Sequence, residues 1–266
     1  NVTVRNPWYS QNGDGLDVDS CENVLVINSS FDVGDDAICI KSGKDADGRR
    51  RAKPCKNLIV DNCVVFHGHG GFVVGSEMSG GVENMKVANC RFLGTDVGLR
   101  FKSCRGRGGV VKNIFIEDIV MMNIPTEPLL FDLHYGGKSA VEAAEEEGSQ
   151  FNVPYVPADE TTPQFRDIFI KDIICSGAAR AMYFNGIPEK NIENIVVEDC
   201  EIVSVKGADL RYSNGVVLKN VDITQSEGQG YIIANSKNVQ IIDCSDAAGS
   251  EMPDVYQYNS HNVTID

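Results

Sequence analysis

The chain has 266 residues, with 24 Lys and Arg against 38 Asp and Glu, a net charge of −14 and a pI near 4.7. With 42% hydrophobic and 23% charged residues, it has the composition of a globular protein and not of a disordered tail or a disulfide miniprotein. The net charge repels nucleic acid and anionic lipid, and no apolar run approaches the ~18 residues of a membrane-spanning helix. Neither nucleic acid nor a membrane is therefore an expected partner.

A short strand pattern headed by Asn, Asp or Gly recurs along the whole chain. The heads are Asn1, Asn23, Asn57, Asn84, Asn113, Asp167, Asn194, Gly215, Asn238 and Asn262. The shortest spacings between heads, 21–24 residues, are typical of a solenoid coil, and the longer ones indicate the same unit with an inserted loop. A leucine-rich repeat would need a regular Leu frame, which the sequence lacks.

We therefore expect an all-β fold, a right-handed parallel β-helix of about nine to ten coils. Residues 1–266 should form a single domain, with longer insertions at residues 44–54 and 136–163. The first coil shows no cap, so we expect N-terminal coils and a cap to be missing from this chain.

The nine cysteines are an odd number, so they cannot all pair within the chain. CxxC spacing is absent and there are four His residues, which argues against a zinc site. Buried free thiols are the expected state. A cysteine closes several strands at one phase of the repeat, which predicts a buried column; these residues are Cys63, Cys90, Cys200 and Cys244.

Position within the repeat predicts which polar side chains meet, because a solenoid stacks residues one coil apart at the ~4.8 Å spacing of strands. Asp14 follows the head Asn1 at the same interval as Asp36 follows Asn23. Likewise, Asp35 follows Asn23 at the same interval as His69 follows Asn57. We expect each pair to meet across adjacent coils.

The apolar residues check this alignment. Counted from the strand heads, offsets 15 and 17 hold Leu16 and Val18, Ile38 and Ile40, Phe72 and Val74, and Leu99 and Phe101. Asp17, Arg100 and Lys102 occupy the alternate offsets, so they should point outward onto the face that carries the acids. Crowded carboxylates raise the pKa of at least one of them, which suits a general acid. Taken singly, each Asp-Gly motif could also be a corner turn.

Four motifs resemble, in order and spacing, those of glycoside hydrolase family 28, the polygalacturonases and their relatives. They are Asn12-Gly13-Asp14, Gly34-Asp35-Asp36, Gly68-His69-Gly70 and Arg100-Phe101-Lys102, with Gly13 in place of the family's Thr and Phe101 in place of its Ile. Residues 42–50 and 75–81 are similar to bacterial exo-acting members.

The resemblance implies an inverting hydrolase of the α-1,4 bonds between galacturonate units of pectin, with exo action preferred. It implies no metal and no cofactor, and a location in the periplasm or outside the cell. By resemblance, Asp35 is the acid that protonates the glycosidic oxygen, and Asp14 and Asp36 hold the attacking water. His69 tunes the protonation of the acid.

The resemblance also predicts substrate-binding residues. Arg100 can hold a uronate carboxylate bidentately and Lys102 as a point charge, while Tyr135 is similar to the family's substrate-stacking tyrosine and Asn12 belongs to the first motif. Arg49 and Arg107, in two basic loops, are candidates for further uronate contacts, with solvated loops as the alternative. The expected partner is an acidic polysaccharide or oligogalacturonide.

Three alternatives stay open. The first is a family 28 hydrolase of rhamnogalacturonan or branched galacturonan. The second is a calcium-dependent pectate lyase, in which clustered Asp residues would supply part of the 6–8 oxygen ligands that Ca²⁺ takes. The third is a solenoid that binds polysaccharide without cleaving it. Chelator sensitivity and an unsaturated product would separate lyase from hydrolase.

Overall fold

The computed structural model describes residues 1–137, 151–247 and 253–266. The expected insertion at residues 136–163 therefore lies partly outside the described residues. In chain order the elements are β1 (Thr3–Arg5), β2 (Leu16–Asp19), β3 (Glu22–Ile27), β4 (Ser30–Asp32), β5 (Asp36–Lys41), α1 (Asp45–Arg51), β6 (Cys55–Asp61), β7 (Val64–Gly75), β8 (Val82–Phe92), β9 (Thr95–Lys102), β10 (Val110–Ile124), β11 (Leu129–Asp132), β12 (Gln164–Asn185), β13 (Ile192–Arg211), β14 (Ser213–Asn214), β15 (Val217–Ala234), β16 (Lys237–Ile242), β17 (Ser245–Asp246), β18 (Val255–Tyr258) and β19 (His261–Ile265).

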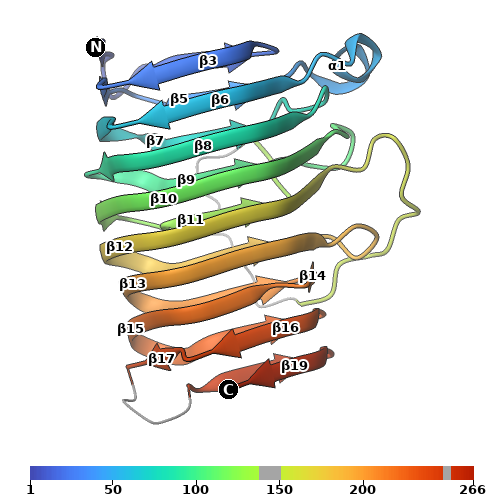
Figure 1. Ribbon diagram of the computed structural model, residues 1–266. Helices are drawn as coiled ribbons and strands as arrows, with labels where there is room; N and C mark the ends of the chain where they lie inside the picture. Colours follow the sequence, from blue (N-terminus) through green and yellow to red (C-terminus); the bar gives the residue numbers. More distant parts are fainter. Residues whose placement is uncertain (138–150, 248–252) are drawn as a thin grey trace.

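The strands stack as the rungs of a parallel β-helix, as predicted. On the face that concerns the site, β2 pairs with β5, β5 with β7, β7 with β9 and β9 with β11, all in parallel. Figure 1 shows these rungs following one another from the blue N-terminal end to the red C-terminal end. Neighbouring strands on one face therefore come from successive coils, and sequence phase becomes position along the solenoid.

The strand heads align because each coil turns a corner at an Asn or Asp in the left-handed region. Asn23, Asn57 and Asn84 have φ near +60°, a conformation that few residues other than Gly, Asn and Asp adopt. The amide of Asn57 donates to Asn23 Oδ1 at 3.0 Å, and that of Asn113 donates to Asn84 Oδ1 at 3.1 Å. The repeated asparagines thus form the corner and connect neighbouring coils.

The first head was assigned to the wrong corner. Thr3 pairs with Ser30, so Asn1 aligns with Asn28 and not with Asn23. Leu16 nevertheless pairs with Ile38, as the shared offset predicted. Both statements hold because the connection between β1 and β2 is longer than the equivalent connection between β4 and β5. The longer connection compensates for counting from the wrong corner, so Leu16 still reaches the register that was predicted.

One cluster of buried apolar side chains runs through the solenoid from Val18 to Cys244. The predicted inward residues are in it, except Leu16, which is partly buried and packs against it. Phe101 stacks on Phe131 with 4.5 Å between ring centroids. All nine cysteines are described and none is in a disulfide; seven are buried, Cys21 is exposed and Cys104 is half-buried. The predicted cysteine column contains other residues as well, because β10 places Ile119 beside Cys90 and β12 places Ile173 beside Cys200.

The first predicted insertion contains a short helix, α1, which the strand repeat did not predict. Its first turn carries Asp45 and Asp47 and its last turn carries three arginines, so the side-chain charges complement the helix dipole. Gly48 allows close packing, since a Cβ there would lie 2.8 Å from the side chain of Ser79. Among the described residues, no helix has the length and apolar composition that crossing a bilayer requires.

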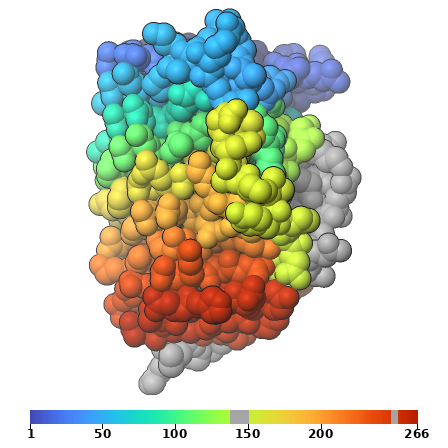
Figure 2. Space-filling model, turned by 90° about the vertical axis from the view of Figure 1, so that its right-hand side faces the viewer, coloured from blue at the N-terminus to red at the C-terminus, as the bar shows by residue number. Residues whose placement is uncertain are grey.

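The end of the second insertion, residues 151–163, runs along the side of the solenoid. Figure 2 shows this yellow-green segment lying across several coils. The N–H of Val153 donates to the hydroxyl of Tyr212 at 2.8 Å, and Gly106 donates to the carbonyl of Thr161 at 3.0 Å. The segment therefore links coils that are far apart along the axis.

Candidate active site

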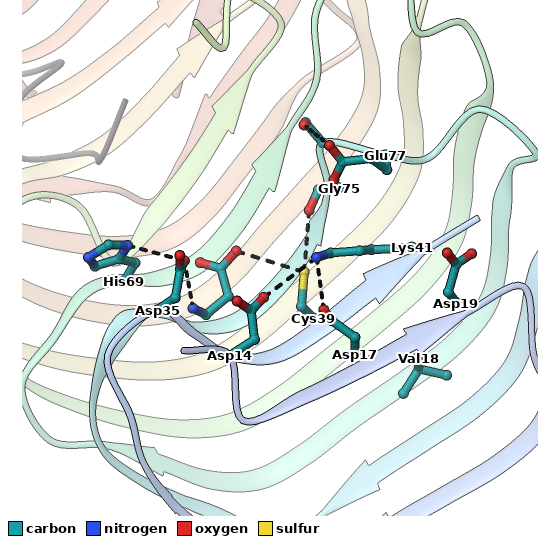
Figure 3. A network of polar contacts seen from close by, with 12 residues as sticks. Asp14, Asp17, Val18, Asp19, Asp35, Cys39, Lys41, His69, Gly75 and Glu77 are labelled. Atoms are coloured by element: carbon teal, nitrogen blue, oxygen red, sulfur yellow. Dashed lines mark hydrogen bonds and ion pairs between the residues drawn. The ribbon is translucent and has the colours of Figure 1, made fainter. Parts of the chain in front are cut away.

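Asp35 and His69 meet across adjacent coils, as their shared offset predicted. Asp36 pairs with Gly70 in the β5–β7 register, which places Asp35 beside His69. Nδ1 of His69 lies 3.1 Å from Oδ1 of Asp35, and the backbone N–H of His69 donates to the Asp35 carbonyl at 2.9 Å. Figure 3 shows the imidazole pointing toward the Asp35 carboxylate.

This contact determines the charge state of both groups. Burial would raise the pKa of Asp35, but the hydrogen bond from His69 and the charges of His69 and Lys102 lower it below its usual value. The same hydrogen bond raises the pKa of His69 against the opposing effect of burial. In the free protein the contact therefore favours a carboxylate paired with an imidazolium.

Asp14 and Asp36 also lie together, with carboxylate oxygens within 4.8 Å of each other. Burial, then the charge of Asp35, raises the pKa of Asp14 to about 6, while Lys41 opposes the shift. Burial and the crowding of acids thus raise a carboxyl pKa at Asp14 and not at Asp35. Figure 3 shows Asp14 beside Cys39, with Lys41 in contact with both Asp14 and Asp17.

Arg100 and Lys102 lie on the face of the acids, as their offsets predicted. Lys102 Nζ lies 2.6 Å from Asp36 Oδ2, and Arg100 Nη1 lies 3.3 Å from Asp36 Oδ1. The side chain of Asp36 is 2% exposed and that of Arg100 is 3% exposed. An unpaired charge at this depth would be costly, and the two cations supply Asp36 with partners in the interior.

These residues border a cleft of about 490 Å³. It is lined by Trp8, Tyr9, Ser10, Gln11, Asn12, Gly34, Asp35, His69, Arg100, Lys102, Tyr135 and Gly137. Lys102 Nζ lies 4.9 Å from the centroid of the Tyr135 ring, and the Arg100 guanidinium lies 5.7 Å from it. Six of the ten site residues predicted from the sequence therefore share this cleft, and Asp14 and Asp36 adjoin it behind Asp35.

Arg49 and Arg107 lie apart from that cleft. Arg49 Nη1 donates to the carbonyls of Gly106 and Arg107, at 2.6 and 3.1 Å. Arg107 is paired with Asp45 at 2.5 Å and with Glu77 at 3.3 Å. In this structure both guanidinium groups connect the loop that contains α1 to the loop after β9.

Two side chains around the acids, Asp96 and Lys41, were not among the residues predicted from the sequence. Asp96 Oδ2 lies 4.0 Å from His69 Nε2, on the side away from Asp35. Lys41 Nζ lies 3.5 Å from Asp14 Oδ2 and 2.9 Å from Asp17 Oδ1. The signal for Asp96 was present, because it follows the head Asn84 at the interval at which Asp35 and His69 follow their own heads.

Asp14, Asp36 and Cys39 are a possible set of metal ligands among the described residues, with donor atoms within 4.8 Å of one another. Three donors, one of them sulfur, match poorly the six to eight oxygens that Ca²⁺ takes. Burial also raises the pKa of Cys39 well above its usual value, which keeps the thiol protonated. The Asp36 carboxylate is already paired with the ammonium group of Lys102. The set does not fit the calcium site of a lyase.

The arrangement suits acid–base chemistry on an anionic ligand. One carboxyl, Asp35, faces the cleft, and two more, Asp14 and Asp36, lie behind it. Arg100 and Lys102 supply positive charge beside them. Carboxyl groups in such different environments can divide the roles of acid and base between them.

Comparison with known proteins gives a family match over residues 1–156, to the family described as glycosyl hydrolases family 28. An exo-poly-alpha-D-galacturonosidase of Dickeya chrysanthemi is 29% identical over 72% of this chain and 30% of its own length. A polygalacturonase of Ralstonia nicotianae is 29% identical over 92% of this chain and 46% of its own length. The chain thus spans less than half the length of either relative.

Two solved structures share the fold. A hyperthermoactive exopolygalacturonase from Thermotoga maritima has a TM-score of 0.68 and 32% identity, over 80% of this chain and 44% of the other. A family 28 exopolygalacturonase of Yersinia enterocolitica has a TM-score of 0.64 and 21% identity, over 95% of this chain and 39% of the other. The second likeness concerns the fold alone.

Proposed function

The chain belongs to glycosyl hydrolase family 28, and on that premise we propose that it is an inverting hydrolase of the α-1,4-galacturonide bonds of pectin. The observation that carries the proposal is the set of Asp14, Asp35 and Asp36 beside a cleft that also contains Arg100 and Lys102. The acids supply the chemistry of glycoside hydrolysis, and the cations suit a uronate substrate.

Asp35 is the proposed acid. In the free protein its pKa is lowered, chiefly by His69 acting against burial, so it must gain a proton in the complex. Entry of an anionic sugar excludes water from the carboxyl and adds negative charge, and both effects raise a carboxyl pKa. Asp35 then gives its proton to the glycosidic oxygen as the bond to the anomeric carbon breaks.

Asp14 is the proposed base. The pKa of Asp14 is raised to about 6, so its carboxylate binds a proton more strongly than an ordinary aspartate does. Asp36 is paired with Lys102 at 2.6 Å. A water held between the two carboxylates attacks the anomeric carbon from the face opposite the leaving oxygen. Asp14 takes the proton of that water, and the sugar is released with inverted configuration.

Arg100 and Lys102 are the proposed partners of the substrate carboxylate, and Tyr135 is proposed to pack on a sugar ring beside them. Lys102 Nζ and the Arg100 guanidinium lie 4.9 and 5.7 Å from the centroid of the Tyr135 ring, which lines the same cleft as Asn12. A uronate therefore meets positive charge and an aromatic face together, which supports galacturonan as the substrate of an acidic protein.

We propose exo action, supported by the exo-acting relative from Dickeya chrysanthemi and the exopolygalacturonase from Thermotoga maritima. The periplasm or the cell exterior is the proposed location, because a cell-wall polymer is met there. We also propose a single right-handed domain of about nine to ten coils, supported by the continuous core from Val18 to Cys244.

The test is incubation with de-esterified polygalacturonate, with and without a chelator, followed by reducing ends, absorbance of unsaturated uronates and product size. We expect new reducing ends, early monomer or dimer, no absorbance and no effect of the chelator. Unsaturated products that disappear with the chelator would indicate a lyase. Binding without any cleavage would leave a polysaccharide-binding solenoid.

A further inference from the structure

Two aromatic side chains that the proposed mechanism does not use line the same cleft as Asp35. Trp8 and Tyr9 lie in the connection between β1 and β2, with 61% and 91% of their surface exposed. Single exposed aromatics are ordinary on protein surfaces. Two consecutive ones at the wall of a polar cleft resemble the aromatic lining of a ligand site.

The indole of Trp8 is held in a fixed orientation. Its ring is stacked on the imidazole of His67, with centroids 4.0 Å apart and planes 6° apart. Its Nε1–H donates to Asp32 Oδ1 at 2.7 Å. His67 Nδ1 in turn lies 2.6 Å from the carbonyl of Val33. Because the polar atom of the indole is already bonded, Trp8 presents a ligand with a flat apolar surface and no donor.

The loop that carries Trp8 is fixed relative to the acid. Ser10 bonds to the Pro7 carbonyl through both its N–H, at 3.0 Å, and its hydroxyl, at 2.6 Å. The loop packs so closely on Gly34 that a Cβ there would lie 2.5 Å from the Pro7 carbonyl oxygen. Gly34 immediately precedes Asp35, so the distance from the indole to the acid is set by packed backbone.

Trp8 and the cations lie on opposite sides of Asp35 along the direction of the strands. The indole contacts Asp32 and His67, which precede Asp35 and His69 in their own coils. Arg100 and Lys102 pair with Val73 and Gly75, which follow His69 on β7. A polymer that crosses the coils at Asp35 would thus contact cations on one side of the acid and an aromatic surface on the other.

We propose that Trp8, supported by His67, forms a second sugar subsite that packs against the face of a pyranose ring. This inference rests on the proposed function, because it takes galacturonan as the polymer in the cleft. The subsite lies across Asp35 from the uronate-binding pair Arg100 and Lys102. It holds the unit on the other side of the cleaved bond through ring contact and without a charge.

The chain offers a direct probe, since Trp8 is its one tryptophan. The experiment titrates trigalacturonate into the protein and into its Asp35→Asn variant, and records tryptophan emission. We expect a saturable blue shift, because a sugar on the ring displaces water. Citrate is the control for charge without a pyranose ring, and should leave the emission unchanged.

Kinetics of variants complete the test. Trp8→Ala should lower kcat/KM on trigalacturonate about tenfold, the effect of one lost aromatic contact, whereas Trp8→Phe should stay within a few-fold. Constant emission at concentrations that the protein hydrolyses, with unchanged Trp8→Ala kinetics, would overturn the subsite and leave the hydrolase standing. A blue shift without hydrolysis would support the subsite and contradict the proposed function. If trigalacturonate produced neither a blue shift nor hydrolysis, both the subsite and the proposed function would be contradicted.

Discussion

Lys41 Nζ lies 3.5 Å from Oδ2 of Asp14, one coil away along the stack of β2 and β5. It also bonds to Asp17 at 2.9 Å, so its position is held from two sides. Its positive charge lowers the pKa of Asp14, yet burial and then the charge of Asp35 still raise that pKa to about 6. Lys41 therefore adjusts the acidity of the proposed base without belonging to the substrate cleft.

Lys41→Gln should move the acidic limb of the pH profile of kcat to higher pH. The reason is that the neutral side chain no longer lowers the pKa of Asp14, so the proposed base is protonated over a wider range. The profile of kcat reports the complex, in which the proposed acid Asp35 already carries its proton, so this limb follows Asp14. Lys86→Gln, at an exposed lysine paired with Glu117, is the control. A limb that stays in place would show that Asp14 is not the group that must be ionised.

Asp14→Asn should stabilise the fold at neutral pH while it removes activity. A carboxyl whose folded pKa is raised contributes stability that is fully present below its unfolded pKa of 3.8 and is lost as the pH rises through about 6. The neutral amide avoids this loss, worth up to about 3 kcal/mol for a shift of this size. Urea unfolding at pH 7.5 and pH 4 measures the difference in the free energy of unfolding between the variant and the unsubstituted protein. The variant should be more stable at pH 7.5 and nearly equal in stability at pH 4. Equal effects at both would contradict the assigned pKa.

Asp35→Asn should reduce turnover of polygalacturonate by a factor of about 10²–10⁴, the usual contribution of general acid catalysis. Side-chain volume is kept, but the charge interaction with His69 that lowers the pKa of Asp35 is lost, so the unfolding midpoint should fall slightly at neutral pH. Asp118→Asn makes the same chemical change at an exposed corner with φ +56°, where Asn is equally suited, and should retain full activity. Near-normal turnover of Asp35→Asn would remove Asp35 from the role of acid.

Asn57→Ala should destabilise the solenoid by about 1–2 kcal/mol. Asn57 has φ +58°, which is costly for alanine, and its amide bonds to Asn23 at 3.0 Å. Asn57→Gly loses the same hydrogen bond but tolerates the backbone angle, so it should recover most of the stability. Urea midpoints of the two variants decide the matter. Equal losses of stability in the two variants would show that the lost hydrogen bond to Asn23, and not the backbone angle, causes the destabilisation.

The site could be predicted where the repeat determines position. Asp35 meets His69 because parallel strands in register convert sequence offset into a neighbour one coil away. Lys102 lies two coils from Asp36, with β7 between their strands, and its long side chain reaches the carboxylate on the face that its offset predicted. The offset of Asp14 from Asn1 was correct by compensation: the head was at the wrong corner, and the longer loop that follows it made up the difference.

The loops could not be predicted, since no register constrains them. Arg49 lies on a helix that the strand pattern did not indicate, and it bonds to backbone carbonyls and not to the cleft. Trp8 reaches the cleft through its stack on His67, a contact between a loop and a strand that sequence offset does not encode. The charge states also needed geometry, because the lowered pKa of Asp35 depends on the 3.1 Å contact with His69.

Proton NMR of the first product released from trigalacturonate tests the central claim most directly. If Asp35 protonates the leaving oxygen while Asp14 and Asp36 direct water to the opposite face, the α-linked substrate must yield the β-anomer first. The α-anomer should then appear only at the rate of mutarotation. Initial release of the α-anomer would mean retention, and an unsaturated product would mean elimination; either would contradict the roles assigned to the three carboxyl groups.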